Sequence, residues 1–450
     1  MPSERALDMD FHLGPSPYRT TSSGDNTCSL EGTRLSPLEN GLKMNILLSA
    51  FACNPEWGSE AGVGWAWAEY LTDLGHEVYL LTTEGRRASI QRALETRPRP
   101  NLHVSYMEVD WCPGHVPIFG IYPFYFAWQF KAFLQAKKLF KVGELDCVHH
   151  LTYGSYRTPF FLSCLGVPSI LGPIGGGETV PLRLTKGMSF RGILHECIRK
   201  VANATYFLNP ISHLVWHRST LILAVTEETL RIVPRRYRHK CRVLLAVTTP
   251  ASRPEFVEKI KGCGQLRALF VGRFLGWKGA HLAIRALKIA RKTAPGITLR
   301  LIGFGLDEVR LKALARSNGV EDAIEWTSEI SRAELLAEYG KHDMLIFTNL
   351  RDAGATVGLE ALSRGMPILC FKLGPYGSII DSSCGSSIDA DERSLDEIVQ
   401  AMADELVRFC AMPDREWRAL REGACERGEQ FRVKETAGKA YTWLAELCNS

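Results

Sequence analysis

Short apolar runs alternate with stretches of helical periodicity along this 450-residue chain from residue 44 onward. The first run is NILLS at 45–49, and HEVYLLT follows at 76–82 after a pattern of Ala, Trp and Leu typical of a helix. Runs almost free of polar residues, separated by helices, indicate a parallel sheet covered on both faces. Further strands of the first half are expected at 104–109, 146–151, 168–171, 221–226 and 242–246.

The second half of the chain repeats this alternation. We expect strands at 267–271, 298–302, 324–327, 344–348 and 367–371, with helices at 278–292, 307–318, 332–341 and 357–364. From residue 393 the pattern is helical to the end, and the last helix, at 433–447, is expected to cross back to the first half. The sequence therefore predicts an α/β protein with two Rossmann-like, doubly wound parallel-sheet domains. In such sheets, ligands bind at the loops that follow the strands.

Two segments without this pattern divide the chain. Eighteen of residues 1–43 are Ser, Thr, Gly or Pro, which is typical of a disordered leader. Residues 248–265 are polar and contain Pro and Gly, as a linker does. We therefore predict an N-terminal domain at 44–247, a C-terminal domain at 266–430 and a crossover helix at 431–450.

Composition excludes several classes of protein. Lys and Arg exceed Asp and Glu by 54 − 49 = 5, too little for a general nucleic-acid binder. The 13 cysteines include no C-x-x-C pair and lie mostly in apolar runs, which fits reduced thiols in a cytoplasmic protein better than disulfides or zinc. No apolar run reaches about 18 residues, so we expect no transmembrane helix.

The loop GRFLGWKG at 272–279 carries two cations. Arg273 offers a planar fork and Lys278 a mobile point charge, a pair suited to two phosphates. The loop is not a Walker A motif, because Gly279 stands where Ser or Thr should follow the Lys. Taken alone, it is equally typical of a solvated basic turn.

The stretch RDAGATVGLEALSRGMPI at 351–368 leads from a buried strand through a small-residue loop into a helix. Asp352 on the loop and Glu360 in the helix can face the same crevice and accept hydrogen bonds from sugar and ribose hydroxyls. The alternative interpretation is an Asp N-cap followed by an exposed helix Glu. Three amides at the helix N-terminus would face an anion: those of Thr356, Val357 and Gly358.

Together these motifs resemble the GT-B glycosyltransferases, specifically the retaining family 4, also called group 1, over about residues 44–447. By this resemblance, Arg273 and Lys278 hold the donor diphosphate and Glu360 binds the ribose. Asp352 matches a Glu that contacts the hydroxyls of the donor sugar. The resemblance implies two Rossmann-like domains that face each other across a cleft and close around the donor.

Several glycines fit the same resemblance. Gly62 and Gly64 match the family's glycine pair after the first strand, which closes over the donor, and Trp67 blocks a dinucleotide-binding reading of that segment. Gly303 and Gly305 look like the Gly-x-Gly turn that lines the donor site. Near Asp352, Gly354 and Ala355 replace the usual Phe-Gly, and we place Gly354 on the donor-binding loop.

Two segments of the first half could face the sugar and the acceptor. His149 and His150 end a predicted strand, and because strand side chains alternate, only one can face the site. By family position we choose His150 as a contact of the donor sugar; the alternative is a structural histidine. Gly176, Gly177 and Glu178 follow the next strand, and Glu178 either binds the acceptor or caps a helix.

Aromatic and basic segments raise the question of a membrane. Residues 111–142 combine ten aromatics with four lysines, which suits an interfacial helix, although an ordinary helix covering the sheet explains them too. Residues 188–221 form a second such stretch that could wall the acceptor site. A basic cluster could face anionic lipid or simply be solvated: Arg235, Arg236, Arg238 and Lys240.

The resemblance implies transfer of a hexose from a UDP- or GDP-sugar to a glycan or lipid-linked hydroxyl acceptor, with retention and without a metal. Backbone groups near Ser328 and Ile330 would read the base, whose identity stays open. We expect a cytoplasmic protein, and peripheral contact with the inner face of the membrane stays an open alternative. The competing hypotheses are a sugar-nucleotide epimerase of the same fold, a nucleotide-dependent oxidoreductase and a catalytically silent binding partner.

Overall fold

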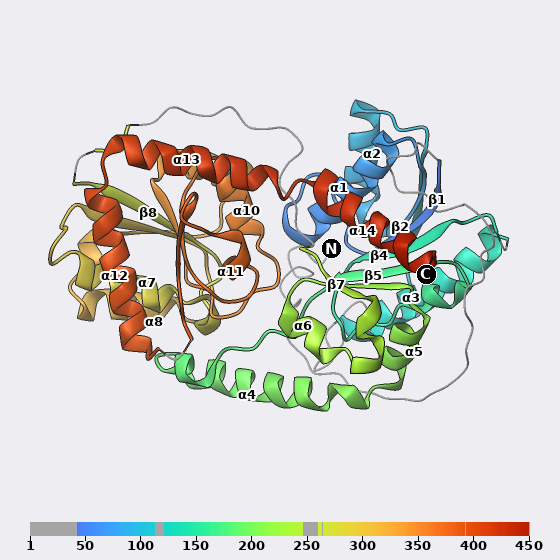
Figure 1. The fold of residues 1–450 in the computed structure, drawn as a ribbon, viewed down its shortest axis with the longest axis horizontal. Helices are drawn as coiled ribbons and strands as arrows, with labels where there is room; N and C mark the ends of the chain where they lie inside the picture. The colour runs from blue at the N-terminus through green and yellow to red at the C-terminus, as the bar shows by residue number, and fades with distance from the viewer. Residues whose placement is uncertain are drawn as a thin grey trace. The chain divides into compact units, whose positions relative to one another are not determined.

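The computed structural model describes residues 43–112, 121–141, 143–245, 260–262, 264–391 and 393–449. Almost all of the predicted leader and most of the predicted linker lie outside these ranges. The chain divides into two compact units (Figure 1). The N-terminal unit contains the described parts of Met1–Gly177, Ile198–Ala246 and Val433–Ser450, and the C-terminal unit those of Glu178–Cys197 and Val247–Arg432.

The N-terminal unit is built on a seven-stranded sheet in the order β3-β2-β1-β4-β5-β6-β7. All neighbouring strands are parallel, as their apolar runs predict. The predicted strand at 168–171 continues to Ile174, with a register shift against β6 after Leu171. The strands are β1 (Asn45–Ala50), β2 (Glu77–Thr83), β3 (Leu102–Met107), β4 (Cys147–Thr152), β5 (Ser169–Ile174), β6 (Leu221–Ala224) and β7 (Cys241–Val243).

Helices cover both faces of this sheet. Side chains of β4 alternate between the faces: His149 contacts Trp67 of α1 and Tyr441 of α14, whereas His150 contacts Tyr125 of α3. The C-terminal helix α14 thus packs in the N-terminal unit, as predicted. The helices are α1 (Ser59–Asp73), α2 (Arg87–Thr96), α3 (Tyr122–Leu139), α5 (Pro210–Arg218), α6 (Glu227–Ile232) and α14 (Val433–Cys448). Helix α4 (Phe190–Thr205) belongs to both units, because its residues up to Cys197 lie in the C-terminal unit and those from Ile198 lie in the N-terminal unit.

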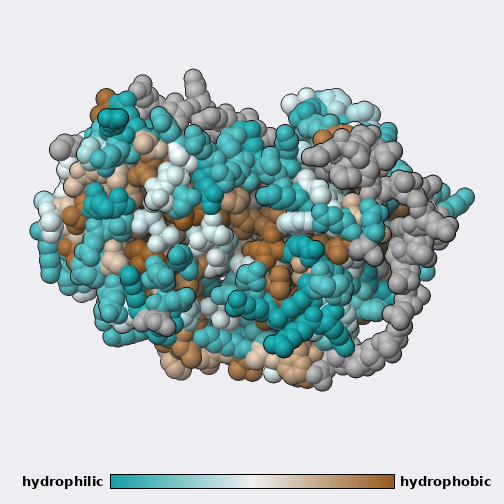
Figure 2. Space-filling model, in the orientation of Figure 1, coloured by the Kyte–Doolittle hydropathy of each residue, from teal (hydrophilic) through white to brown (hydrophobic). Residues whose placement is uncertain are grey.

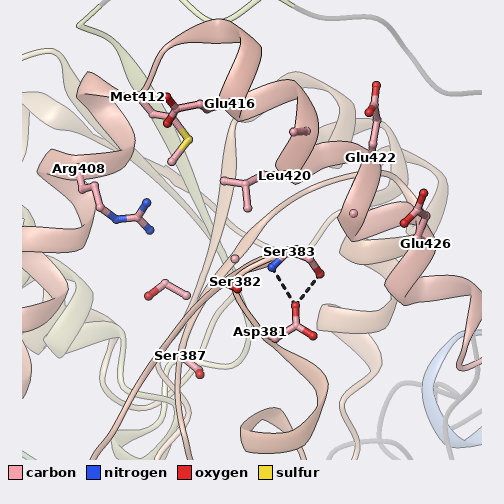
Figure 3. A pocket seen from close by; sticks show the side chains of 14 residues that line it. Asp381, Ser382, Ser383, Ser387, Arg408, Met412, Glu416, Leu420, Glu422 and Glu426 are labelled. Atoms are coloured by element: carbon pink, nitrogen blue, oxygen red, sulfur yellow. Dashed lines mark hydrogen bonds between the residues drawn. The ribbon is translucent and has the colours of Figure 1, made fainter.

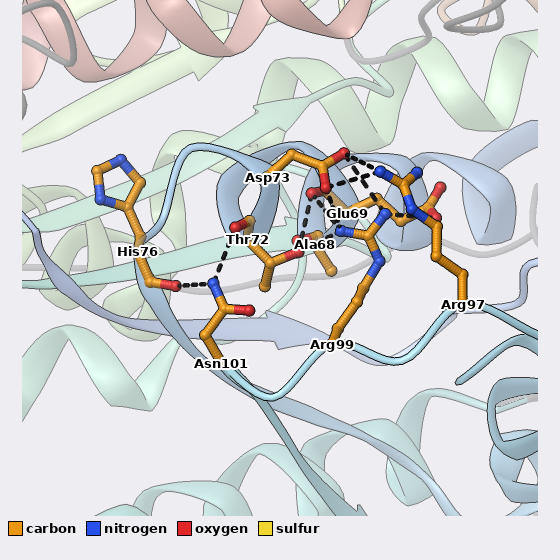
Figure 4. A network of polar contacts seen from close by, with 8 residues as sticks. All are labelled: Ala68, Glu69, Thr72, Asp73, His76, Arg97, Arg99 and Asn101. Carbon is orange, nitrogen blue, oxygen red and sulfur yellow. Dashed lines mark hydrogen bonds and ion pairs between the residues drawn. The ribbon is translucent and has the colours of Figure 1, made fainter. Parts of the chain in front are cut away.

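One buried arginine fastens the end of α1 to the segment that leads into β3 (Figure 4). The guanidinium of Arg99 donates to the carbonyl oxygen of Glu69 at 3.0 Å, to Thr72 Oγ1 at 2.7 Å and to Asp73 Oδ1 at 2.7 Å. Asn101 Nδ2 adds bonds of 2.8 Å to the carbonyl oxygens of Thr72 and His76. These bonds tie the last turn of α1 and the residues just after it to the segment before β3.

The C-terminal unit is built on a six-stranded parallel sheet in the order β10-β9-β8-β11-β12-β13. Relabelled from its first strand, this order is 3-2-1-4-5-6, the doubly wound order, with its switch point between β8 and β11. The N-terminal sheet has the same order and one further strand. The strands are β8 (Leu266–Val271), β9 (Ile297–Ile302), β10 (Ile324–Thr327), β11 (Met344–Phe347), β12 (Ile368–Phe371) and β13 (Gly385–Ile388).

The helices of the C-terminal unit form two groups. Helix α7 packs against α8 and α12, and α10 packs against α9 and α13. The sequence missed β13 and α11, because GSSI is polar and α11 is a single turn. The helices are α7 (Ala280–Ala290), α8 (Glu308–Ser317), α9 (Arg332–Lys341), α10 (Thr356–Ser363), α11 (Tyr376–Ile379), α12 (Leu395–Ala411) and α13 (Asp414–Glu429).

The described residues bear on two further expectations. The eleven cysteines among them are free thiols, and most are buried. In the same ranges no helix is both long enough and apolar enough to cross a membrane.

Candidate functional site

The two loops singled out in the sequence follow β8 and β11, the strands at the switch point of the C-terminal sheet. Backbone bonds join them directly. The amide of Leu350 donates to the carbonyl oxygen of Trp277 at 2.8 Å, and Thr348 Oγ1 donates to the carbonyl oxygen of Lys278 at 3.3 Å. Because the carboxyl ends of adjacent parallel strands share one edge, the fold brings the predicted phosphate and sugar groups to one place.

Lys278 and Asp352 meet across these loops. The Nζ atom of Lys278 lies 3.1 Å from Asp352 Oδ2. The other carboxylate oxygen, Oδ1, accepts from the Gly354 amide at 2.7 Å, and the Asn349 side chain donates to Oδ2. Burial alone would raise the pKa of Asp352, but the Lys278 charge and these hydrogen bonds outweigh it and hold that pKa below its ordinary value. The site thus contains a carboxylate that stays charged at neutral pH, paired with the side chain of Lys278.

Helix α10 begins beside this ion pair without a side-chain cap. Its N-cap is Ala355, in the left-handed conformation at φ 52°. The alternative interpretation of Asp352 as the N-cap is therefore wrong. The first amides of an α-helix have no intrahelical acceptor, so those of Thr356 and Val357 leave the positive end of the helix suited to an anion.

The third predicted amide of α10, that of Gly358, differs from the expectation. It donates to the phenol oxygen of Tyr376 at 3.1 Å. Tyr376 is 1% exposed, and its ring stacks on Phe347 with centroids 4.0 Å apart. A Cβ at Gly358 would lie 2.4 Å from Cε1 of Tyr376, so only glycine allows this contact. The absence of a side chain at Gly358 therefore makes room for the Tyr376 phenol, which accepts the hydrogen bond of the Gly358 amide.

Glu360 points inward from α10. It is 6% exposed, so the alternative interpretation of an exposed helix Glu is wrong. Its Oε1 accepts from Arg332 Nη2 at 3.1 Å and Nε at 3.3 Å, and its Oε2 accepts from Tyr339 at 3.4 Å. Burial, together with the Glu360 charge, raises the pKa of the Tyr339 phenol well above its ordinary value. The carboxylate is thus held in place by two side chains of α9.

The remaining predicted donor residues of this unit lie on loops at the same edge of the sheet. Arg273 follows β8, and Gly303 and Gly305 follow β9. Gly303 has φ 153°, and a Cβ there would lie 1.9 Å from the carbonyl oxygen of Gly272, so the β9 loop rests directly on the Arg273 loop. Ser328 and Ile330 lie between β10 and α9.

In the N-terminal unit, Gly62 and Gly64 lie inside the first turns of α1, which begins at Ser59. A Cβ at Gly64 would lie 2.6 Å from the carbonyl oxygen of Ala52, so the glycine lets α1 rest on the loop after β1. Glu60 of the same turn accepts from the Gly154 amide at 2.8 Å. The first turns of α1 therefore contact both the loop after β1 and the loop after β4, the two strands at the switch point of the N-terminal sheet.

Both histidines of β4 are fully buried. His149 Nε2 lies 2.8 Å from the carbonyl oxygen of Gly172, and its Nδ1 lies 3.1 Å from the Tyr441 hydroxyl. His150 Nε2 lies 3.3 Å from the Tyr125 hydroxyl. Burial lowers the pKa of His149 to about 4 and that of His150, which also feels His149, to about 3. At neutral pH both rings are uncharged, so His150 can act only as a neutral hydrogen-bonding group.

The segment after β5 is held by hydrogen bonds. Arg199 donates to the carbonyl oxygen of Gly176 at 2.6 Å, and the Gly177 amide donates to Thr229 Oγ1 at 3.0 Å. Glu178, at 2% exposed, begins the C-terminal unit and lies in the loop before a helical turn at Leu182–Thr185. The N-cap of that turn is Pro181, so the alternative interpretation of Glu178 as a helix cap is wrong.

Comparison with known proteins finds a family similarity in the C-terminal part of the chain. Residues 254–409 match the family model of Glycosyl transferases group 1. This glycosyl transferases group 1 region contains every predicted site residue of the C-terminal unit from Arg273 to Glu360.

The curated relatives match this chain in sequence over part of their length. The solved structures match it in fold over nearly all of their own length. Glycogen synthase from Mycobacterium tuberculosis is 31% identical over 157 residues, 34% of this chain and 38% of that protein. The chain covers 38% to 46% of the first curated relatives it matches. WaaG, a glycosyltransferase involved in lipopolysaccharide biosynthesis, has a TM-score of 0.54 at 17% identity, covering 88% of this chain and 98% of its own. HepE from Anabaena, in complex with UDP and glucose, has a TM-score of 0.51 at 16% identity, covering 87% and 96%.

The identities of 17% and 16% with WaaG and HepE show the fold alone. That fold is the GT-B fold predicted from the sequence. The fold class, two Rossmann-like parallel-sheet domains with a C-terminal helix that returns to the first, is confirmed.

A pocket of about 940 Å³ lies away from these site residues in the C-terminal unit (Figure 3). It lies between residues 381–387 and the helices α12 and α13, with Glu416, Glu422 and Glu426 on α13. Because residues 381–384 precede β13, the pocket adjoins the amino edge of the parallel sheet, opposite the edge that carries Lys278. None of the predicted site residues lines it.

Proposed function

We propose that this chain is a nucleotide-sugar-dependent glycosyltransferase that moves a hexose to a hydroxyl acceptor with retention of anomeric configuration. The observation that carries the proposal is the contact between Lys278 and Asp352 beside the uncapped start of α10. A cation, a carboxylate and free helix amides at one sheet edge suit a ligand that joins a diphosphate to a polyhydroxylated sugar.

The diphosphate in this proposal is held by Lys278, Arg273 and the amides of Thr356 and Val357. As the bond from sugar to phosphate breaks, negative charge grows on the leaving diphosphate, and these groups stabilise it without reorganisation. Binding of the diphosphate draws Lys278 away from Asp352, which frees the Asp352 carboxylate to accept hydrogen bonds from the sugar hydroxyls. The acceptor hydroxyl then attacks the anomeric carbon from the same face of the sugar that the diphosphate leaves. The leaving phosphate oxygen takes the proton of that hydroxyl.

The nucleoside is assigned to the other end of the same edge. Glu360 is held by Arg332 at the start of α9, and one of its oxygens can accept from a ribose hydroxyl while the ion pair persists. Backbone groups at Ser328 and Ile330, just before α9, are placed to read a uracil or guanine base. We therefore propose a UDP- or GDP-hexose as the donor and basic side chains in the role that a metal plays elsewhere.

The acceptor is proposed to be a glycan or a lipid-linked sugar. Among similar proteins, WaaG is involved in lipopolysaccharide biosynthesis and the Mycobacterium tuberculosis protein is named a glycogen synthase. We assign acceptor binding to Gly176, Gly177 and Glu178, and a donor-side role to Gly62, Gly64 and His150, with the reaction at the inner face of the membrane.

The test is a panel of UDP- and GDP-hexoses, scored for binding by calorimetry and for nucleotide release with and without glycan acceptors. The expected result is acceptor-dependent release with one base and anomeric retention in the product by NMR. Lys278→Ala should lower kcat by about 100-fold with the fold intact. Lys292→Ala, an exposed lysine after α7, is the matched control and should leave turnover unchanged. Absence of donor binding by the folded chain would overturn the proposal.

A further inference from the structure

Arg351, the residue before Asp352, has its side chain buried inside the C-terminal unit. It is 7% exposed, and its Nε donates to Glu196 Oε1 at 2.8 Å. Glu196 lies in the part of α4 that belongs to the same unit, is fully buried, and accepts from the Val180 amide at 3.3 Å through Oε2. Burial alone would raise the pKa of Glu196, but the contact with His195 and the Arg351 charge hold that pKa at about 2. Glu196 and Arg351 therefore form a charged pair inside the unit.

The position of this carboxylate is unusual for its helix. Apolar residues of the same part of α4 lie outside, since Phe190 is 79% exposed and Leu194 49%. Figure 2 shows apolar atoms along the lower edge of the view, where Figure 1 places α4. Taking two charges out of water is unfavourable, and apolar residues of similar volume often stabilise a protein as well as a buried ion pair does. Stability alone therefore does not explain the pair of Glu196 and Arg351.

Trp277, the residue before Lys278, packs on the same arginine. The Arg351 Cζ atom lies 4.5 Å from the centroid of the Trp277 ring. The His195 ring stacks on this indole with centroids 5.3 Å apart, and Trp277 is 7% exposed. A guanidinium over an aromatic face is attracted by the ring quadrupole, most strongly where water is excluded. The contact therefore fastens the loop after β8 to the loop after β11 at a buried place.

Two side-chain contacts thus join these loops at consecutive positions. Trp277 meets Arg351, and the residues that follow them, Lys278 and Asp352, lie 3.1 Å apart. The inner contact is buried and held by Glu196, whereas the side chains of the outer pair are 25% and 13% exposed. Because each inner residue is bonded to an outer one through a peptide, the inner contact limits where the two outer side chains can go.

We propose that Arg351 is a positioning residue that sets the distance between Lys278 and Asp352. It acts through its contacts with Glu196 and Trp277. The inference rests on the proposed function, in which the donor diphosphate draws Lys278 away from Asp352. Loops that are fastened below the site let Lys278 exchange one partner for the other while its backbone stays in place. The charge that grows on the leaving diphosphate then meets a cation that is already in position.

The first test measures the pair of Lys278 and Asp352 and needs no ligand. Urea unfolding of Lys278→Met, Asp352→Asn and the double variant gives the coupling energy of the pair. The cycle is then repeated in Arg351→Lys, which keeps a charge beside Glu196 but offers no planar face to Trp277. Most of the coupling should be lost in this background, because an ion pair without a fixed geometry contributes little.

The second test measures turnover with the panel of UDP- and GDP-hexoses. Arg351→Lys should lower kcat about tenfold and change the donor KM less than about threefold, because misplacement of Lys278 affects the transition state more than the bound donor. Trp277→Phe, which reduces the aromatic face, should lower the coupling and kcat in the same direction. It takes the place of Arg351→Lys if circular dichroism shows that variant to be unfolded.

Arg421→Lys is the matched control. Arg421 is 4% exposed, its Cζ lies 5.1 Å from the centroid of the Trp417 ring, and its Nε donates to the carbonyl oxygen of Gly365 at 3.1 Å. It is thus a buried arginine over a tryptophan in the same unit, but it lies on α13, beyond the C-terminal end of α10. The control should lower Tm and leave both the coupling and kcat as in the parent chain.

The outcomes separate this inference from the proposed function. A coupling energy in Arg351→Lys equal to that of the parent overturns the inference, and so does a parent-like kcat in that variant. Equal losses in Arg421→Lys overturn it too, because any buried arginine would then have the same effect. If the parent neither binds nor uses a donor, the proposed function fails, and the coupling energy alone decides whether Arg351 positions the pair.

Discussion

The ammonium nitrogen of Lys278 lies 3.1 Å from Oδ2 of Asp352, and the two side chains are only 25% and 13% exposed. The pair joins the loops after β8 and β11, so it links two neighbouring strands, the third and fourth in the order of the C-terminal sheet. A partly buried pair of this kind contributes mainly by preventing an unpaired charge, because removal of one partner leaves the other desolvated.

Lys278→Met is therefore expected to lower the free energy of unfolding by about 2 kcal/mol. The folded pKa of Asp352 is lower than its unfolded value, so its contribution is present above about pH 4 and is lost as pH falls through the folded pKa. Urea unfolding at pH 7 and at pH 3 measures both effects, and the penalty should shrink at the lower pH. Lys278→Met/Asp352→Asn should recover part of the loss; no recovery would contradict the pairing.

The contact of Gly358 with Tyr376 gives a prediction about the start of α10. A Cβ at Gly358 would lie 2.4 Å from the buried Tyr376 ring, which stacks on Phe347 and has little room to move. Gly358→Ala should cost about 1 to 3 kcal/mol of unfolding free energy and displace the ring. Gly340→Ala, a control in α9 whose added Cβ meets nothing within 4 Å, should not destabilise the protein. Thermal unfolding and the Tyr fluorescence of the variants measure the two effects.

The hydrogen bond between the Tyr376 hydroxyl and the Gly358 amide can be tested without adding a side chain to α10. Tyr376→Phe keeps the ring and removes the acceptor of the Gly358 amide, so the expected loss is about 1 kcal/mol. If the proposed donor site is correct, the freed amide should tighten binding of a nucleoside diphosphate. Calorimetry measures this, and a weaker affinity would mean that the hydroxyl itself assists the ligand.

The sequence predicted every strand of both sheets except β13, because the other strands are almost free of polar residues whereas β13 has the polar sequence GSSI. It also brought Lys278 and Asp352 to one edge, since both follow central strands. It did not find Arg332 or Tyr376, whose contacts join segments far apart in the chain. The nearest signal was the GPYG turn after β12, which places a large aromatic residue where the chain returns to the α10 loop.

The direction of α4 could not be predicted either. Its sequence has a clear apolar face, and the usual inference puts that face on the core. The structure turns Glu196, Arg199 and Asn203 inward, because each bonds to a partner between 23 and 155 residues away along the chain. Periodicity shows that a helix has two faces, but the tertiary hydrogen bonds decide which one is inside.

The buried histidines of β4 predict a loss of stability in mild acid. The folded pKa values of His149 and His150, about 4 and about 3, lie below the unfolded value of about 6.5. The unfolded chain therefore binds more protons below pH 6.5, and stability falls by about 1.4 kcal/mol per pH unit for each histidine as the pH drops toward 4. His150→Phe, placed between Phe160 and Tyr125, should flatten this dependence in urea unfolding of the N-terminal unit. An unchanged slope would show that other groups cause the acid sensitivity.

Two arginines that pair with the same aspartate allow a buried ion pair to be compared with an exposed one. Arg97 and Arg99 both reach Asp73, at 3.0 and 2.7 Å, but their side chains are 65% and 4% exposed. Arg97→Met should change the unfolding free energy by less than about 0.5 kcal/mol, because an exposed pair is screened and its side chains lose entropy. Arg99→Met should cost about 3 kcal/mol, because Glu69 and Thr72 lose a buried donor and the end of α1 loses its attachment to β3. Urea unfolding of both variants gives the comparison. Equal losses would mean that Asp73, the one partner they share, carries the effect, and that the contacts with Glu69 and Thr72 add nothing.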